Sequence, residues 1–451
     1  MSKVVRMMLP KKVAFAVRPR GEKMWALSCL ATLALSTLLS AACVATIDGD
    51  GEQPTPDGIA GHSGSGGAPS PGMGGQPFNP LPPPPPPPPP PDGNTDAFLD
   101  GFFPIAVDGP RPDDYHGSTD CSATPATGDY AGWSSCGVNT IARGPNCSDS
   151  SCPTAFDAQV TAAGLHMIRA PLANPAQDIA KHAADHLLLA WTQMDEPDAN
   201  GGLSRNLPGL SSKYASLTAL AGHPPVYLNV GGSDLMATNQ PYQQAFAEAD
   251  WVANDIYPVA GFLDDQFMRG DLTLVGKALD KFAEVAANKP RFAWIETNNI
   301  LGQGDPTPAQ VRAEIWIAIV HGARGILYFQ EQVEPAFDLL STSAAVRTEM
   351  GKQHAAITQL SVVLQGAINP AAMGASAAAP LAVGWRQSVS GRYIIAVNSS
   401  SSTLSAAAVT LTGLVGAQAA MVWGESRMVP VVNGRVVDEF ASYARHIYVI
   451  P

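Results

Sequence analysis

The sequence is poor in charged residues. Only 15% of its 451 residues are Asp, Glu, Lys or Arg, and the acidic residues outnumber the basic ones by 39 to 27. The formal net charge is −12, whereas proteins bind the phosphate backbone of nucleic acids through clustered Lys and Arg. The composition therefore excludes nucleic acid as an expected partner.

Motifs for metals and dinucleotides are also missing. The nine histidines are scattered along the chain, and no H-E-x-x-H motif occurs. A G-x-G sequence at 302–304 lies in an expected loop before a helix and lacks the strand–turn–helix context of a dinucleotide site. We therefore expect no catalytic metal and no cofactor.

The N-terminus has the features of an export signal. Basic residues precede an apolar run, Met24–Leu39, which is shorter than the roughly 20 residues that span a bilayer. Small residues and Cys43 follow, as in a bacterial lipoprotein signal, in which Cys43 would be lipidated. The alternative is ordinary cleavage after Ala42. We favour a lipoprotein anchored to a membrane at the cell surface or in the periplasm, with secretion as the other outcome.

Composition divides the chain into four expected segments. Residues 1–43 form the signal, for which Met7 and Met24 are alternative start positions. Residues 44–97 are rich in Gly, Ser and Pro and include ten consecutive prolines, so this segment cannot form a core. We expect a tether there, followed by a barrel domain over 98–366 and a C-terminal domain over 367–451.

Four cysteines lie within 32 residues of the exported part of the chain: Cys121, Cys136, Cys147 and Cys152. In an oxidising compartment this pattern predicts two disulfides. Three pairings are possible, and we favour 121–136 with 147–152. A zinc site is the alternative, but the spacing lacks a matching C-x2-C.

Strand-like and helix-like segments alternate over the barrel domain. Nearly continuous apolar runs, typical of parallel strands buried on both faces, occupy 102–109, 137–143, 165–171, 186–194, 225–232, 251–258, 291–297 and 324–330. Helical patterns occupy 154–164, 175–185, 208–221, 243–249, 272–288, 308–322 and 343–365. Eight such units over about 270 residues predict a (β/α)8 barrel. Residues 110–136 show little helical pattern and are expected to form an irregular loop.

Residues 367–451 change in character. Short apolar segments alternate with turn residues, and Asn433-Gly434 is a strong hairpin signal. This part predicts a small antiparallel β-sandwich.

Polar residues gather where the expected barrel strands end. In a (β/α)8 barrel the reactive groups lie at the C-terminal ends of the strands. In strand order these residues are Asp108, Arg143, Arg169, Asp195 and Glu196, Asn229, Asp255 and Tyr257, Glu296, and Gln330. Two glutamates, after the fourth and seventh strands, could face each other across the barrel. Such a pair can hydrolyse a glycosidic bond, one as acid and the other as nucleophile or base.

The stretches A-W-T-Q-M-D-E-P-D, N-D-I-Y-P-V, F-A-W-I-E-T-N-N and H-G-A-R-G-I-L-Y-F resemble the barrel ends of clan A glycoside hydrolases, in which a β-sandwich often follows the barrel. The resemblance implies that Glu196 is the acid/base and Glu296 the nucleophile of a retaining enzyme. It also implies that Tyr257 bonds the nucleophile and that Arg143 or Arg169 supports it. Asp195 departs from the clan, which usually has Asn at this position to bind a sugar hydroxyl.

Each of these residues also has a structural explanation. D-E-P is a common helix start, the arginines and Asp255 could form a salt bridge, and Trp294, a candidate sugar platform, could be core. We expect an exported glycoside hydrolase acting on a polysaccharide or glycan. The alternatives are a non-catalytic carbohydrate-binding or surface-interaction protein on a degenerate barrel, and another barrel hydrolase with an acid pair.

Overall fold

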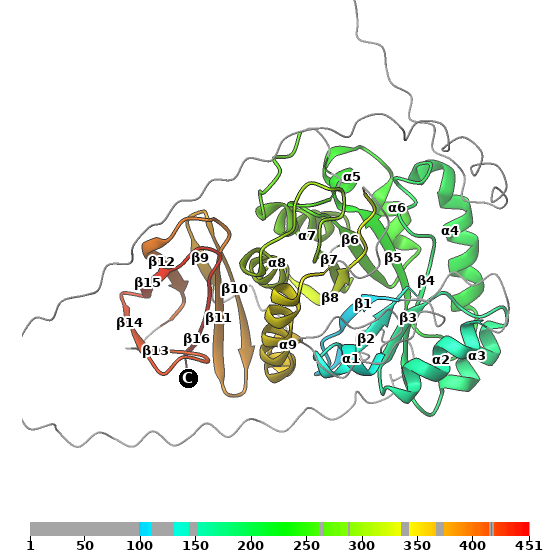
Figure 1. Ribbon diagram of the computed structural model, residues 1–451, viewed down its shortest axis with the longest axis horizontal. Coiled ribbons are helices and arrows are strands. Elements are labelled where there is room, and N and C mark those ends of the chain that lie inside the picture. Colours follow the sequence, from blue (N-terminus) through cyan, green and yellow to red (C-terminus); the bar gives the residue numbers. More distant parts are fainter. Residues whose placement is uncertain are drawn as a thin grey trace, which may run out of the picture. The chain divides into compact units, whose positions relative to one another are not determined.

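The computed structural model describes residues 99–109, 130–143, 152–261, 263, 266–286, 289–334, 342–366, 374–414, 416 and 419–450, with only the backbone for 152–155. Eight parallel strands form a closed barrel in chain order, and β8 pairs back to β1 (Figure 1). The strands are β1 (Ile105–Asp108), β2 (Thr140–Ala142), β3 (His166–Arg169), β4 (Leu188–Thr192), β5 (Val226–Gly231), β6 (Trp251–Asp255), β7 (Arg291–Glu296) and β8 (Ala323–Phe329). The predicted barrel is confirmed.

Two apolar layers explain why these strands are apolar on both faces. Inside the barrel, small side chains such as Ala106 and Ala253 pack with large rings such as Phe292 and Trp294. The alternate residues, such as Val107 and Val252, pack outward against the helices. Because side chains alternate along a strand, inward-facing positions at the strand ends place their side chains at the C-terminal rim.

The helices are α1 (Tyr130–Ser135), α2 (Cys152–Ala162), α3 (Pro175–His182), α4 (Leu203–Thr218), α5 (Gly232–Ala237), α6 (Tyr242–Ala247), α7 (Thr273–Val285), α8 (Pro308–Val320) and α9 (Ala344–Leu364). Several begin where the sequence supplies a cap. Asn174 and Thr307 each accept an N–H of the first turn, and a proline follows each of them.

Three helices differ from the expectation. α1 occupies part of the segment expected to be irregular, and α5 follows β5 within an expected loop. α4 begins at Leu203, five residues before the expected start, and contains Pro208. Pro208, the first residue of the expected helix, therefore lies about one and a half turns inside α4.

The C-terminal domain is an antiparallel sheet of eight strands in the order β10-β11-β16-β13-β14-β15-β12-β9, with its own core. This confirms the predicted sandwich. The strands are β9 (Gly374–Ala377), β10 (Leu381–Ser388), β11 (Gly391–Asn398), β12 (Leu404–Thr412), β13 (Ala419–Val422), β14 (Met428–Val432), β15 (Arg435–Phe440) and β16 (Arg445–Ile450). The predicted hairpin joins β14 to β15, and Asn433 and Gly434 both have positive φ, as a type I′ turn requires.

α8 contacts both domains, which explains its unusual sequence. Its second half, Ile315–Val320, is an unbroken apolar run, and every residue of this run is buried. One face lies against β7 and β8, and another lies against β10 and β11. Arg386 of β10 donates to the carbonyl of Ile319 at 2.8 Å, so the sandwich also satisfies a backbone acceptor near the end of this helix.

Among the described residues, no helix is both long and apolar enough to cross a membrane. The expected signal with Cys43, the tether, Cys121, Cys147 and the side chain of Cys152 lie outside the described residues. Cys136 is disulfide-bonded, whereas the pairing of the four cysteines stays a prediction.

The β14–β15 hairpin gives a stability prediction. In Gly434→Ala the new methyl group would lie 3.0 Å from the carbonyl oxygen of Leu411, at a φ of +70°. Left-handed backbone costs a residue with a Cβ about 1–2 kcal/mol, and the close contact adds to this cost. Gly424→Ala is the control, because its φ of +77° is similar but no atom lies within 4 Å. Urea unfolding should show the larger loss for Gly434→Ala, and equal losses would contradict this account.

Candidate active site

Arg143 lies at the centre of the C-terminal rim. Its Nε and Nη2 atoms donate to the two oxygens of Asp108 at 3.0 and 2.6 Å, and its Nη1 donates to Asp195 at 2.7 Å. The guanidinium lies 4.6 Å above the ring of Trp294, within cation–π range. One cation thus joins the ends of β1 and β2 to the loop after β4.

Asp195 is held from two sides. Arg143 bonds one carboxylate oxygen, and Asn229 of β5 donates to the other at 3.1 Å. Its side chain is nevertheless 40% exposed. Two of the predicted substrate-binding residues, Asn229 and Asp195, therefore meet directly, and the structure presents a fixed, accessible carboxylate at the rim.

Glu196 adopts a strained backbone. Its φ is +42°, which costs a residue other than glycine on the order of 1–3 kcal/mol. Backbone bonds hold it there: its N–H donates to Asn229 at 3.2 Å, and its carbonyl accepts from Asn200 at 2.8 Å. The alternative interpretation of D-E-P as a helix start does not hold, because α4 begins only at Leu203.

The carboxyl of Glu196 meets that of Asp255 from β6 in a side-chain hydrogen bond. Such a bond between two carboxyl groups needs a proton on one of them. Burial and then the charge of Glu196 raise the pKa of Asp255 well above its ordinary range. Burial and then the charge of Asp195 raise the pKa of Glu196 as well. Asp255 is thus the proton donor of the pair and Glu196 the acceptor.

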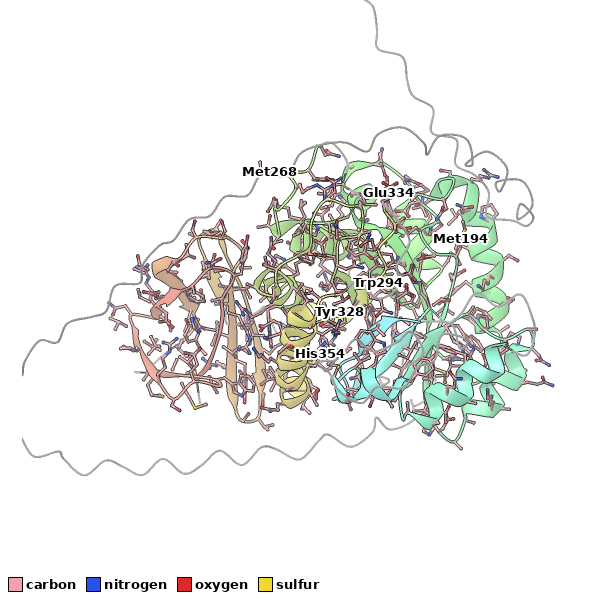
Figure 2. The ribbon with its side chains drawn as sticks, in the orientation of Figure 1. Met194, Met268, Trp294, Tyr328, Glu334 and His354 are labelled. Atoms are coloured by element: carbon pink, nitrogen blue, oxygen red, sulfur yellow. The ribbon has the colours of Figure 1, made fainter. Side chains whose placement is uncertain are left out.

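Three other predicted rim residues support this group. Tyr257 is buried, stacks on Phe329 at 5.4 Å and lies in the field of Asp255 and Arg143. Gln330 donates to the carbonyl of Asp108 at 3.3 Å. Trp294 lies among the barrel strands (Figure 2) and is only 1% exposed. It therefore supports Arg143 from within the barrel and offers no open face to a sugar.

Glu296 is not joined to Glu196 by any contact that the structure shows. It is fully buried, and its two oxygens accept the N–H groups of Val259 and Ala260, both at 2.6 Å. It also shares a hydrogen bond with Glu314 of α8. Burial raises the pKa of Glu296 to about 7, and burial together with the charge of Glu296 raises the pKa of Glu314 well above its ordinary range. Glu314 therefore donates, and Glu296 fastens the loop after β6.

No family model matches the chain, and no curated protein matches its sequence. Solved structures do share its fold. A variant of AmyP bound to maltotriose is 9% identical over 80% of this chain and 99% of that chain, with a TM-score of 0.50. AmyP bound to maltose is 10% identical over 79% and 98%, with a TM-score of 0.50. A GH30 endoxylanase from Clostridium papyrosolvens is 12% identical over 77% and 95%, with a TM-score of 0.42. At these identities the likeness concerns the fold alone.

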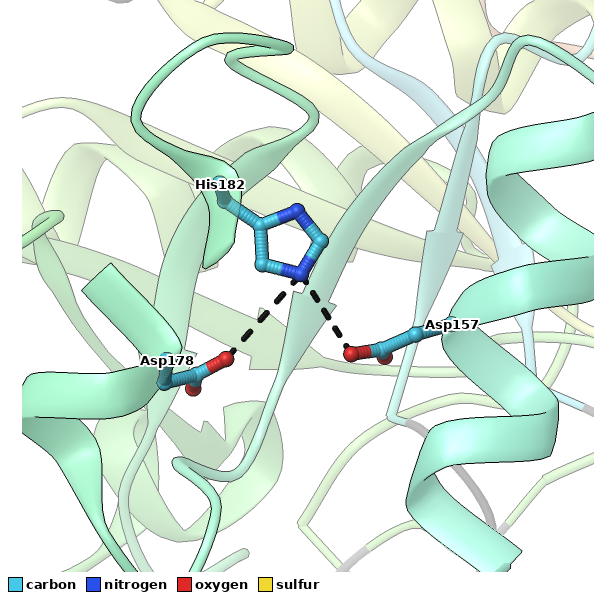
Figure 3. A group of neighbouring side chains, drawn as sticks. All are labelled: Asp157, Asp178 and His182. Carbon is cyan, nitrogen blue, oxygen red and sulfur yellow. Dashed lines mark hydrogen bonds and ion pairs between the residues drawn. The ribbon is translucent and has the colours of Figure 1, made fainter. Parts of the chain in front are cut away.

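Arg169 lies outside this group, in a buried cluster with Asp157, Asp178 and His182. Figure 3 shows the two acids and the histidine of this cluster. It donates to both oxygens of Asp157 at 2.7 and 2.8 Å and to both oxygens of Asp178 at 2.9 and 2.6 Å. Its donors are used within the cluster, so this geometry argues against the predicted role in substrate binding. Ligand atoms of the two acids and His182 lie within 4.8 Å of one another, but Arg169 already provides the positive charge that a metal would bring.

The sequence analysis missed Asp198, the last residue of the D-E-P-D stretch. Its carboxylate accepts the N–H of Gly231 and the hydroxyl of Tyr242, and burial raises its pKa to about 6. Asp198 also repels a charge on Glu196. The stretch itself was the available signal, since three acids within four residues rarely all face solvent beside a buried strand.

The Arg169 cluster predicts how stability depends on pH. Burial opposes the charged form of every member, but hydrogen bonds lower the pKa of Asp157 and Asp178 and raise that of His182. The stability from the two acids is present above about pH 4 and is lost at lower pH. The stability that His182 contributes is present below about pH 6.5, and it is lost as the pH rises through the pKa of His182 in the folded protein. In urea unfolding, the loss caused by His182→Gln should be largest near about pH 5–6 and shrink above it. A loss that grows toward alkaline pH would contradict this sign.

Proposed function

We propose that the barrel is a glycoside hydrolase acting on a polysaccharide or glycan, with Glu196 as its acid/base. One observation supports this most: Glu196 is held on strained backbone at the C-terminal rim, in contact with a second carboxyl group. Strained residues cluster at functional sites, and the rim is where barrel enzymes place their reactive groups.

The chemistry requires a carboxyl group that holds a proton near neutral pH. Burial raises the pKa of Glu196, and Asp255 donates a hydrogen bond to it, so the pair can supply a proton through Glu196 to the leaving glycosidic oxygen. Asp195 beside it is accessible and is fixed by Arg143 and Asn229. A carboxylate in this position would stabilise the positive charge that develops on the sugar ring or bond to its anomeric carbon.

For the nucleophile we revise the expectation. Glu296 would have to release the N–H groups of Val259 and Ala260 before it could reach a sugar. Asp195 is the exposed carboxylate nearest in sequence to Glu196. We assign it the role of nucleophile in a retaining reaction. Retention requires a nucleophile and an acid about 5–5.5 Å apart, whereas inversion leaves about 6.5–9.5 Å for a water. The anomeric form of the first product distinguishes the two.

The substrate and the location are parts of the same proposal. AmyP, which shares the fold, was solved with maltose and maltotriose, so oligosaccharides of this type belong first in a substrate panel. Lipidation at Cys43 and the Gly/Ser/Pro-rich tether would place the barrel outside the cytoplasm, where polysaccharides are encountered.

A non-catalytic carbohydrate-binding protein is the second candidate. The observation in its favour is Glu296, which resembles a clan A nucleophile by position but has both oxygens bonded to the backbone. Binding of a glycan without turnover, across a broad panel of aryl glycosides and polysaccharides, would favour this function.

Glu196→Gln tests the enzymatic proposal. The amide has the size of the carboxyl group but cannot transfer its proton, so the rate of hydrolysis should fall by about 10²–10⁴-fold. Thermal unfolding serves as the control and should show a folded protein. Undiminished hydrolysis by the folded variant would contradict the role of Glu196.

A second pair of variants separates the two possible nucleophiles. Asp195→Asn should reduce hydrolysis by at least about 10³-fold, a loss typical of removing a catalytic group. Glu296→Gln places an NH2 group against one of the two backbone N–H groups that Glu296 accepts, so it should lower the melting temperature and cost activity less than tenfold. The reverse ranking, with Glu296→Gln inactive and Asp195→Asn active, would restore the original assignment.

A further inference from the structure

The contact between Glu196 and Asp255 follows from the register of β5 and β6. Gly231 is the partner of Asp255 across these strands. A Cβ on Gly231 would lie 3.7 Å from Oε1 of Glu196, so the Glu196 carboxyl lies over this glycine. The Glu196 carboxyl therefore lies next to the strand pair that carries Asp255.

One carboxylate oxygen of Asp255, Oδ1, is buried and has no hydrogen-bond donor among the described residues. A carboxylate buried in this way is costly unless donors surround it. The contact with Glu196 is therefore the one that decides the protonation of Asp255.

The charges around the pair are mostly negative. From the elements packed against it, the titratable and charged groups that face it are Asp195, Asp198, Arg143, Tyr227, Tyr257 and Asp234. Arg143 is the one cation of this set, and it is already bonded to Asp108 and Asp195. Two further full charges on Glu196 and Asp255 would have no counter-ion, so the pair holds one proton in common.

We propose that Asp255 is a positioning residue that shares one proton with Glu196. The shared proton keeps Glu196, the acid of the reaction, able to protonate the leaving group. This inference rests on the proposed function. In the first step the shared proton passes through Glu196 to the glycosidic oxygen, and the electrons of the breaking carbon–oxygen bond go to that oxygen. Asp195 bonds to the anomeric carbon.

In the second step a water oxygen bonds to the anomeric carbon as the bond to Asp195 breaks. Glu196 takes the proton of this water, and the pair again holds one proton. Between the steps both carboxyl groups are charged and adjacent, which makes Glu196 a stronger base. Asp255 is half-buried, and in this proposal it acts through Glu196 without contacting the sugar.

Asp255→Asn is the test. Asn can donate to Glu196 but has no proton to share, so Glu196 stays charged at lower pH. The alkaline limb of the pH profile of kcat/KM, which reports the acid, should move down by at least about one pH unit, a tenfold loss on that limb. KM at the optimum should change less than about threefold. The matched control is Glu314→Gln, which removes the titratable proton of the other carboxyl pair and should leave this limb in place.

An infrared measurement separates this inference from the proposed function. At pH 7 the band from the carbonyl stretch of the protonated carboxyl group in this pair should be lost in Asp255→Asn and shifted in Glu196→Gln. This measurement needs no substrate. A folded Asp255→Asn with an unchanged alkaline limb would overturn the inference while leaving the enzyme intact. If the wild-type chain hydrolyses no glycoside, the infrared bands still test the shared proton. If Asp255→Asn does not fold, an unshifted band in Glu196→Gln would overturn it.

Discussion

The guanidinium of Arg143 bonds to Asp108 and Asp195, and it lies 4.6 Å from the centre of the Trp294 ring. The rest of the rim depends on this contact, because it fixes strand ends that are far apart in the sequence and offsets part of a dense negative charge. Arg143 is itself strained, with a φ of +53°. A planar, permanently charged group with several donors is suited to this place, whereas Lys could bond only as a point charge.

Two pairs of adjacent carboxyl groups each avoid holding two negative charges side by side, but the two pairs differ in what the remaining charge does. In each pair one member is protonated and donates to the other. Glu296 uses its charge to hold two backbone N–H groups, so this pair is part of the loop structure. Glu196 has Asp255 behind it and the accessible Asp195 beside it. Only the second pair adjoins a group that a substrate can reach.

The sequence predicted the barrel because parallel strands buried on both faces leave an apolar run at each of eight positions. It also predicted that Asp108, Arg143, Asp195 and Asp255 gather, since strand ends share one rim. It could not predict how a strand-end side chain turns. Arg169 ends β3 just as Arg143 follows β2, yet it bonds to acids on α2 and α3, which depends on helix positions that no local pattern specifies.

The most direct test of the account is a crystal structure of the Glu196→Gln variant with an uncleaved oligosaccharide. The account predicts that the sugar lies across the C-terminal rim. The glycosidic oxygen should be within about 3 Å of the side chain at position 196, with the anomeric carbon facing Asp195. An oligosaccharide bound only to the C-terminal sandwich, or with its glycosidic oxygen remote from position 196, would contradict the account.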